Sequence, residues 1–317
     1  MTQLTTEQLD YLAQSLDALR ERTLADLGER DANYIRGKVR LHRSLELGGR
    51  VLIPLSLTPV GFGAGVACLS VAKILENMEI GHNVMHGQYD WMNDPSLNGR
   101  HYEWDTACDG DSWRLTHNYE HHTYTNILGR DRDYGYGLLR LTADQPWRPR
   151  NLLQTLDYVL LSTFFQWGVA LHELEIENLS RGKISLRDKR KMLGRFARKG
   201  GRQFFKDYIF YPLLTAPVAG KVLAGNLLAN LGRNLWSSSV IFCGHFTEDA
   251  RTFTEAECEG ESRGHWYYRQ LLGSSNFTGS RWMHVLAGHL SYQIEHHLFP
   301  DIPAHRYPEM APRVEQL

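Results

Sequence analysis

The sequence predicts an all-α integral membrane protein, with about four transmembrane helices and a helical cytosolic cap that holds a histidine-rich two-metal site. Residues 51–72 carry no charge, and a membrane-spanning helix needs about 20 such residues. A second apolar region, residues 208–246, is interrupted only by Lys221 and Arg233. Together these regions have room for four crossings arranged as two hairpins. The third observation is a set of clustered histidines outside both regions.

The composition excludes several classes of protein. The formal net charge is −1 at pH 7, so we expect no nucleic-acid partner. The four cysteines form no C-x-x-C pair, which argues against a structural zinc site and for reduced thiols in a cytosol-facing protein. Residues 1–14 are polar, and we expect no signal peptide there. Because histidine motifs occur in both halves, we expect one domain, residues 1–317.

The first part of the chain, residues 1–42, is expected to lie in the cytosol. Leucines recur through residues 5–27 at spacings of three to five, with acids and arginines between them. This pattern predicts an amphipathic helix at the surface or at a membrane interface.

Residues 43–80 are predicted to form the first membrane hairpin. A short, weakly apolar helix is expected near residues 45–57 and a stronger one near residues 60–80. Pro59 and the glycines that follow it, up to Gly65, are expected to make the turn between them.

The distribution of charge predicts the topology of the remainder. Residues 151–171 are apolar enough to cross a bilayer, but residues 181–206 carry eleven lysines and arginines against one acid. Because basic loops stay on the cytoplasmic side, we expect 151–171 to be a buried or interfacial helix that does not span. The second membrane hairpin is then residues 207–244. The cytosolic cap consists of residues 81–206 and 245–317.

Three histidine clusters give the most specific signal. They are His82-x-x-x-His86, His117-x-x-x-His121-His122 and Gln293-x-x-His296-His297. Residues three or four apart share one face of a helix, so each cluster can point two or three imidazoles at one place. Histidine is the commonest metal ligand, and these clusters offer more nitrogens than one ion uses. They predict a two-metal site. Glu79, three residues before His82, could accept a hydrogen bond from the ring N–H of His82 or be an ordinary interfacial acid.

Longer stretches around these residues carry a resemblance to a known family. They are Gly81-His-Asn-Val-Met-His86, Ile241-Phe-Cys-Gly-His245-Phe and His289-Leu-Ser-Tyr-Gln293-Ile-Glu-His296-His297-Leu-Phe-Pro300. In these stretches the chain resembles the integral-membrane fatty acid desaturases, especially actinobacterial acyl-CoA (stearoyl-CoA) Δ9-desaturases, over about residues 31–313. The resemblance implies a multi-pass membrane protein whose active site faces the cytoplasm and contains two iron ions. It also implies O2-dependent insertion of a double bond into an acyl-CoA, at Δ9, or into an acyl lipid.

The resemblance also implies a set of metal ligands, transferred position by position. The set is His82, His86, His117, His121, His122, His245, Gln293, His296 and His297. Gln293 stands where other members have histidine. His289, four residues earlier and on the same stripe if the segment is helical, is an alternative ligand. Ile241 occupies the position at which animal members carry an asparagine.

The electron source is expected to be a separate protein. The sequence contains no glycine-rich dinucleotide fingerprint, so we expect a ferredoxin or an NAD(P)H-dependent reductase. Residues 181–206 could dock an acidic donor, but contact with the headgroups of the lipid bilayer explains their charge better. Arg114, Arg130 and Arg132 are candidates for contact with the phosphates of CoA.

Three other functions remain open at this point. A membrane di-iron hydroxylase of alkanes or lipids would use the same histidines. A zinc-dependent membrane hydrolase needs only three or four ligands and leaves the other histidines unexplained. A non-catalytic metal carrier would consume no O2.

Overall fold

The computed structural model describes residues 4–175, 178–179 and 182–317. The only β pairing in these ranges is an isolated bridge between Ile127 and Phe253, which confirms the prediction of an all-α chain. The α-helices are α1 (Thr6–Ala25), α2 (Glu29–Leu55), α3 (Pro59–Ile74), α4 (Asn83–Met85), α5 (Gly110–Trp113), α6 (His122–Tyr124), α7 (Gln154–Thr163), α8 (Phe165–His172), α10 (Arg190–Phe205), α11 (Tyr211–Leu214), α12 (Ala219–His245), α13 (Arg263–Gly273), α14 (Arg281–Leu286), α15 (Gln293–Leu298) and α16 (Tyr307–Val314). Three further segments are π-helical: Leu75–His82, Arg114–His121 and Lys206–Phe210.

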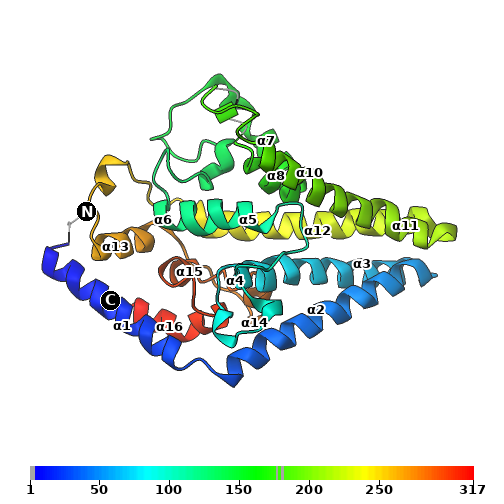
Figure 1. The fold of residues 1–317 in the computed structure, drawn as a ribbon, viewed down its shortest axis with the longest axis horizontal. Coiled ribbons are helices and arrows are strands. Elements are labelled where there is room, and N and C mark those ends of the chain that lie inside the picture. The colour runs from blue at the N-terminus through cyan, green and yellow to red at the C-terminus, as the bar shows by residue number, and fades with distance from the viewer. Residues whose placement is uncertain (1–3, 176–177, 180–181) are drawn as a thin grey trace.

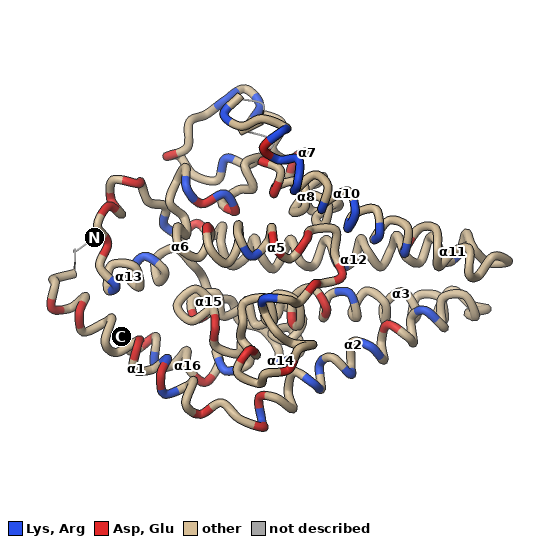
Figure 2. The backbone as a smooth tube through the Cα atoms, in the orientation of Figure 1, with Lys and Arg blue, Asp and Glu red and all other residues tan. Residues whose placement is uncertain are grey.

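Two pairs of long helices extend side by side from the rest of the molecule (Figure 1). α2 and α3 form the first pair. The second pair consists of α12 and the helical stretch Arg190–Leu214, which contains α10, a π-helical segment and α11. α3 of the first pair packs against α12 of the second. Residues 51–72 and 208–220, which include the tips of both pairs, carry no charge, and the tips are tan in Figure 2. The shorter helices gather at the opposite end, where both termini lie. The molecule therefore has an apolar end and a charged end.

The first helix pair differs from the sequence-based expectation. The short helix expected near residues 45–57 is the end of the much longer α2, and the turn consists of residues 56–58. Thr58 caps α3 by accepting a hydrogen bond from the third residue of that helix. The glycines expected in the turn lie inside α3 instead. A Cβ added to Gly65 would lie 2.9 Å from the backbone nitrogen of Ile53, so this glycine permits close packing of two helices.

A buried ion cluster joins the two helix pairs. Asp207 accepts hydrogen bonds from Lys73 at 2.8 Å, Arg50 at 3.0 Å and Asn230 at 3.0 Å. Asp207, Lys73 and Asn230 are buried. Because removing one partner would leave an uncompensated buried charge, the cluster fixes the position of one pair against the other.

The four expected membrane crossings are not confirmed by length and composition. Among the described residues, Pro59–Met85 is one helical stretch long and apolar enough to cross a membrane. A second exists if the pair Arg190–Leu214 and Ala216–His245, bent by 107°, is one span. α2 does not qualify because charged residues continue along it as far as Arg50.

Two other expected helices are present with altered boundaries. Residues 151–171 are divided at Phe164 into α7 and α8, and neither helix is a candidate span. α1 is amphipathic as predicted. It packs Leu12 and Leu16 into a core with Tyr267 and Phe299, so it closes the charged end of the molecule.

Candidate metal centre

The histidine clusters converge where the long helices enter the charged end of the molecule. His82 ends the first π-helical segment, and His117 and His121 lie on the second. His245 is the last residue of α12, and the third cluster lies on α15. π-Helical turns are rare and occur frequently at functional sites. Two of the three π-helical segments here carry these histidines.

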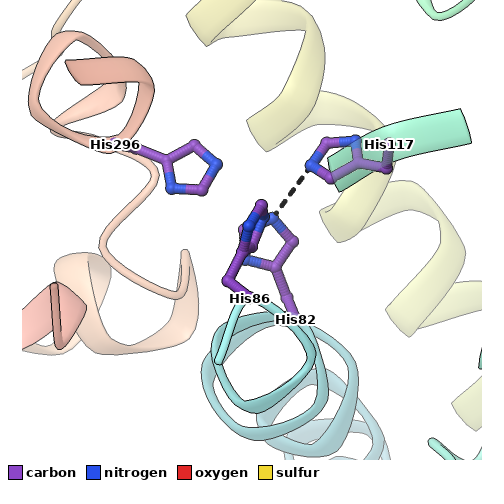
Figure 3. A group of neighbouring side chains, drawn as sticks. All are labelled: His82, His86, His117 and His296. Carbon is purple, nitrogen blue, oxygen red and sulfur yellow. Dashed lines mark hydrogen bonds between the residues drawn. The ribbon is translucent and has the colours of Figure 1, made fainter. Parts of the chain in front are cut away.

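Four histidines form the first group. The candidate ligand nitrogens of His82, His86, His117 and His296 all lie within 4.8 Å of one another. Figure 3 shows the four side chains directed at a common space, with His82 and His86 on one segment and His117 and His296 on two others. One ion could therefore be reached by all four.

Hydrogen bonds fix the protonation of two rings in this group. Asn83 donates its amide N–H to a backbone carbonyl, so its Oδ1 accepts from His82 Nδ1 at 3.1 Å. The carboxylate of Asp133 accepts from His117 Nδ1 at 3.0 Å. A neutral imidazole protonated at Nδ1 presents a lone pair at Nε2. The two Nε2 atoms face each other at 3.4 Å, an arrangement that a cation between them would stabilise.

Three histidines form the second group. The candidate ligand nitrogens of His121, His245 and His297 lie within 4.8 Å of one another. The carboxylate of Asp131 accepts from His121 Nδ1 at 3.0 Å, and Gln270 Oε1 accepts from His297 Nδ1 at 3.1 Å. These acceptors orient the rings as outer partners do at metal sites.

His122 lies between the two groups. Its ring centroid is 4.7 Å from that of His86, 4.8 Å from His296 and 4.6 Å from His297. Both of its nitrogens are buried without a hydrogen-bond partner in the described part of the chain. It could complete either group.

The unpaired ring nitrogens and the protonation of these histidines fit metal binding. Buried nitrogens without a partner among the described residues include His86 Nε2, His121 Nε2, His245 Nδ1 and both nitrogens of His296, whereas buried polar groups are normally hydrogen-bonded. Burial lowers the pKa of His82 to about 3, so this imidazole is neutral. Burial alone would lower the pKa of His121, but the carboxylate of Asp131 beside the ring raises that pKa above its ordinary value.

Gln293 and His289 occupy different environments. Gln293 Nε2 lies 2.7 Å from His245 Nε2, and Gln293 Oε1 is buried without a partner in the described ranges. His289 precedes α15 and is therefore not on a helical stripe with Gln293. Its Nδ1 lies 3.2 Å from Glu79 Oε2, outside both histidine groups.

The suggested role of Glu79 toward His82 is not observed. Tyr34 donates its hydroxyl to Glu79 Oε1 at 2.5 Å, and His289 occupies the other oxygen. Residues 75–82 wind as a π-helix, so Glu79 does not share the face that three-residue spacing on an α-helix predicts.

Sequence reasoning missed the residues that orient the rings. Asn83 directly follows His82, while Asp131 and Asp133 lie in a loop beyond the second cluster, and Gln270 lies on α13. The only available signal was an Asp-x-Asp pair near a histidine cluster. Nothing distinguishes that pair from acids at a protein surface.

An apolar cavity extends from the histidines into the molecule. His82, His117, His121, His245 and Gln293 form part of its wall. The apolar lining includes Met78, Trp104, Trp113, Phe165, Ile241 and Phe246. An apolar group that entered this cavity would meet side chains of both histidine groups.

Comparison with known proteins identifies the family. The family model described as fatty acid desaturase matches residues 58–317. This chain belongs to the fatty acid desaturase family. The NADPH-dependent stearoyl-CoA 9-desaturase of Mycobacterium tuberculosis (strains CDC 1551 / Oshkosh and ATCC 25618 / H37Rv) is 46% identical over 318 residues, which cover 99% of this chain and 74% of the relative. The sn-1 linoleoyl-lipid 6-desaturase of Synechocystis sp. (strain ATCC 27184 / PCC 6803 / Kazusa) is 25% identical over 264 residues, 78% of this chain and 70% of the relative.

Family membership confirms the resemblance inferred from the histidine boxes. The chain is an oxidoreductase that desaturates fatty acyl chains. Histidines that could bind metal lie against an apolar cavity, which is the arrangement that this reaction requires.

Proposed function

We propose that this desaturase introduces a double bond at Δ9 of a saturated acyl-CoA, using O2, two iron ions and electrons from a separate donor. One observation carries the proposal. Within each of the two histidine groups the candidate ligand nitrogens lie within 4.8 Å of one another, and members of both groups line one apolar cavity. The name of the mycobacterial relative, a stearoyl-CoA 9-desaturase, supports the substrate and the position of the double bond.

The donor set supports two iron ions. Imidazole suits iron, zinc, copper and nickel, but tetrahedral zinc would need only four ligands and would leave several buried nitrogens unsatisfied. Iron bound by the two groups would supply the oxidising power to remove hydrogen from an unactivated methylene, which no side chain can provide. We assign the first group to one ion and the second group, with Gln293, to the other, and His122 completes one of the two shells.

The chain's own residues prepare the site for this chemistry. Asp133 and Asp131 hold the Nδ1 protons of His117 and His121, which keeps both Nε2 atoms free. The apolar wall excludes water and holds the acyl chain against the histidines.

An open cleft next to the cavity suits the CoA portion of the substrate. Tyr136 lines both spaces. Arg132, Arg140, Arg150 and Lys183 lie along the cleft, and we propose that its rim binds the phosphates.

Of the three arginines considered from the sequence, Arg132 lines the cleft. Arg114 donates to the backbone oxygens of Gly99 and Tyr102. Arg130 pairs with Glu255. Neither of them is among the residues that line the cleft.

We infer that both helix pairs lie in the bilayer, as four membrane segments, with the histidines on the cytoplasmic side. α12 supports this because its polarity is inverted relative to a soluble helix: Asn226 and Arg233 are 0% and 1% exposed, whereas Leu227 and Leu228 are 52% and 46% exposed. Polar side chains facing the bundle and leucines facing outward are typical of membrane proteins. The electron donor is proposed to be an NADPH-dependent reductase or a ferredoxin.

The function is tested by expression in a host that lacks its own desaturase. The wild-type chain should restore monounsaturated acyl chains and contain two irons per chain. His121→Ala and His297→Ala should abolish the product while the protein still inserts, whereas His101→Ala, at an exposed histidine outside the groups, should not.

Three results would contradict the proposal and identify an alternative. Hydroxylated lipids without monoenes would indicate a hydroxylase. One zinc and no iron per native chain would indicate a hydrolase. Iron without O2 consumption in the presence of donor and acyl-CoA would indicate a carrier.

A further inference from the structure

Glu173 is a buried acid in the mostly apolar lining of the cavity, and it belongs to neither histidine group. It follows α8 directly and is 3% exposed. Its side chain lines the same cavity as His117. Its chain neighbours His172 and Glu175 line the open cleft instead. Glu173 therefore lies on the wall of the cavity, at a point of the chain where the neighbouring residues line the open cleft.

The Glu173 carboxyl has one side-chain hydrogen-bond partner among the described residues. Thr116 Oγ1 lies 2.5 Å from Glu173 Oε1 and 2.9 Å from the backbone oxygen of Ser112. Because a hydroxyl has one hydrogen, Thr116 can donate to only one of these two oxygens at a time. Glu173 Oε2 is buried and has no partner in the described residues. The carboxyl therefore has little to stabilise a negative charge.

The surroundings of the carboxyl also favour its protonated form. Burial raises the pKa of Glu173 to about 8. The hydroxyl of Thr116 and the charge of Arg132 lower it, while the carboxylates of Asp133 and Asp109 raise it. The group is therefore neutral at pH 7 and loses its proton as the pH rises through about 8.

The reaction consumes protons, which must reach a mostly apolar cavity. Conversion of CH2–CH2 to CH=CH supplies two electrons and two hydrogens toward the reduction of O2 to two waters. The other two electrons come from the separate electron donor, and the other two protons must come from solvent. The apolar lining offers few groups that could carry them.

We propose that Glu173 is the proton donor of this active site. Its O–H bond breaks, and the proton passes to the oxygen being reduced to water. The electron pair stays on the carboxylate, which takes a new proton from the side of the cleft. This inference rests on the proposed O2-dependent desaturation and adds a catalytic residue to it.

The test compares Glu173→Gln with Glu259→Gln in the iron-loaded enzyme. Glu259 is the control because its side chain is exposed and lies outside both the cavity and the cleft. General acids contribute about 100-fold or more, so Glu173→Gln should lower product formation by about 100-fold and release hydrogen peroxide from the O2 consumed. Iron content and acyl-CoA binding should stay unchanged. An infrared band of a protonated carboxyl at pH 7 should be lost in Glu173→Gln and kept in Glu259→Gln.

Two results would overturn the proposal. In the first, Glu173→Gln forms product at the wild-type rate and releases no hydrogen peroxide. In the second, the infrared band of the protonated carboxyl is the same in Glu173→Gln as in the wild type. If Glu173→Gln does not fold, Glu173→Asp replaces it. The wild-type enzyme should lose activity as the pH rises through about 8, and Glu173→Asp should lose activity at a different pH. Identical pH–activity profiles for the two enzymes would overturn the proposal. Absence of product from the wild-type enzyme would contradict the proposed desaturation instead.

Discussion

Two acids from one short loop control different halves of the histidine site. Asp133 accepts from His117, a member of the first group, and Asp131 accepts from His121, a member of the second. A carboxylate behind a ligating imidazole fixes its tautomer and raises its basicity. The two acids should therefore be separable by their effects on two metal positions.

Asp131→Asn should weaken iron binding at the second position by about 10- to 100-fold, the usual effect of losing such an outer partner. Asp133→Asn should weaken the first position instead. Competition with a chelator, followed by the iron remaining per chain, measures both. Asp249→Asn, at an exposed acid, is the control. Equal and unchanged retention in all three variants would refute this role of the loop.

A second pair of substitutions decides between Gln293 and His289. His289→Ala should retain both irons, because that ring contacts Glu79 outside the histidine groups. Gln293→Ala should lower the iron content toward one per chain, because its amide lies against His245. Iron per chain in purified protein is the measurement. Loss of iron only in His289→Ala would reverse the assignment.

At the scale of elements, the sequence predicted which segments bring histidines together but not how those segments wind. The spacing of His82 to His86 and of His117 to His121 predicted that each pair shares a face, and both pairs do converge. The i→i+5 winding has no recognisable sequence pattern, and it placed Glu79 against Tyr34 instead of His82. The orienting residues were missed because they contact the clusters only through tertiary structure.

The glycines of α3 illustrate the same limit. Glycine after proline is a turn signal, and only the packing of α2 on α3 shows that Gly65 lies in a helix contact. Gly65→Ala should destabilise the protein by about 1–3 kcal/mol through overpacking against Ile53. Gly63→Ala is the control, because it raises the helix propensity by the same amount as Gly65→Ala and its added Cβ has no atom within 4 Å. The thermal midpoint in detergent should therefore fall in Gly65→Ala alone, and equal midpoints would contradict close packing here.

At the scale of the whole molecule, the apolar and charged ends are organised by opposite rules. In the charged end, α1 buries leucines and exposes acids and arginines, as in a soluble protein. In α12 the relation is reversed, with Asn230 buried and Leu227 exposed. Composition along the chain located both apolar regions, but it could not reveal which face of each helix is polar, because that depends on neighbouring helices.

The inverted polarity leads to a prediction about membrane insertion. Leu227 lies eight residues from the start of α12, about 12 Å from the tip, and would be deep in a hydrocarbon core of about 30 Å. A charge there costs about 2.5–3.5 kcal/mol, so Leu227→Asp should reduce the fraction of protein that resists alkaline extraction from membranes. Leu186→Asp, at a leucine of the proposed cap that is 65% exposed, should behave like the wild type. If both variants stay equally resistant to extraction, the outward face of α12 does not contact lipid, and the second helix pair lies outside the bilayer.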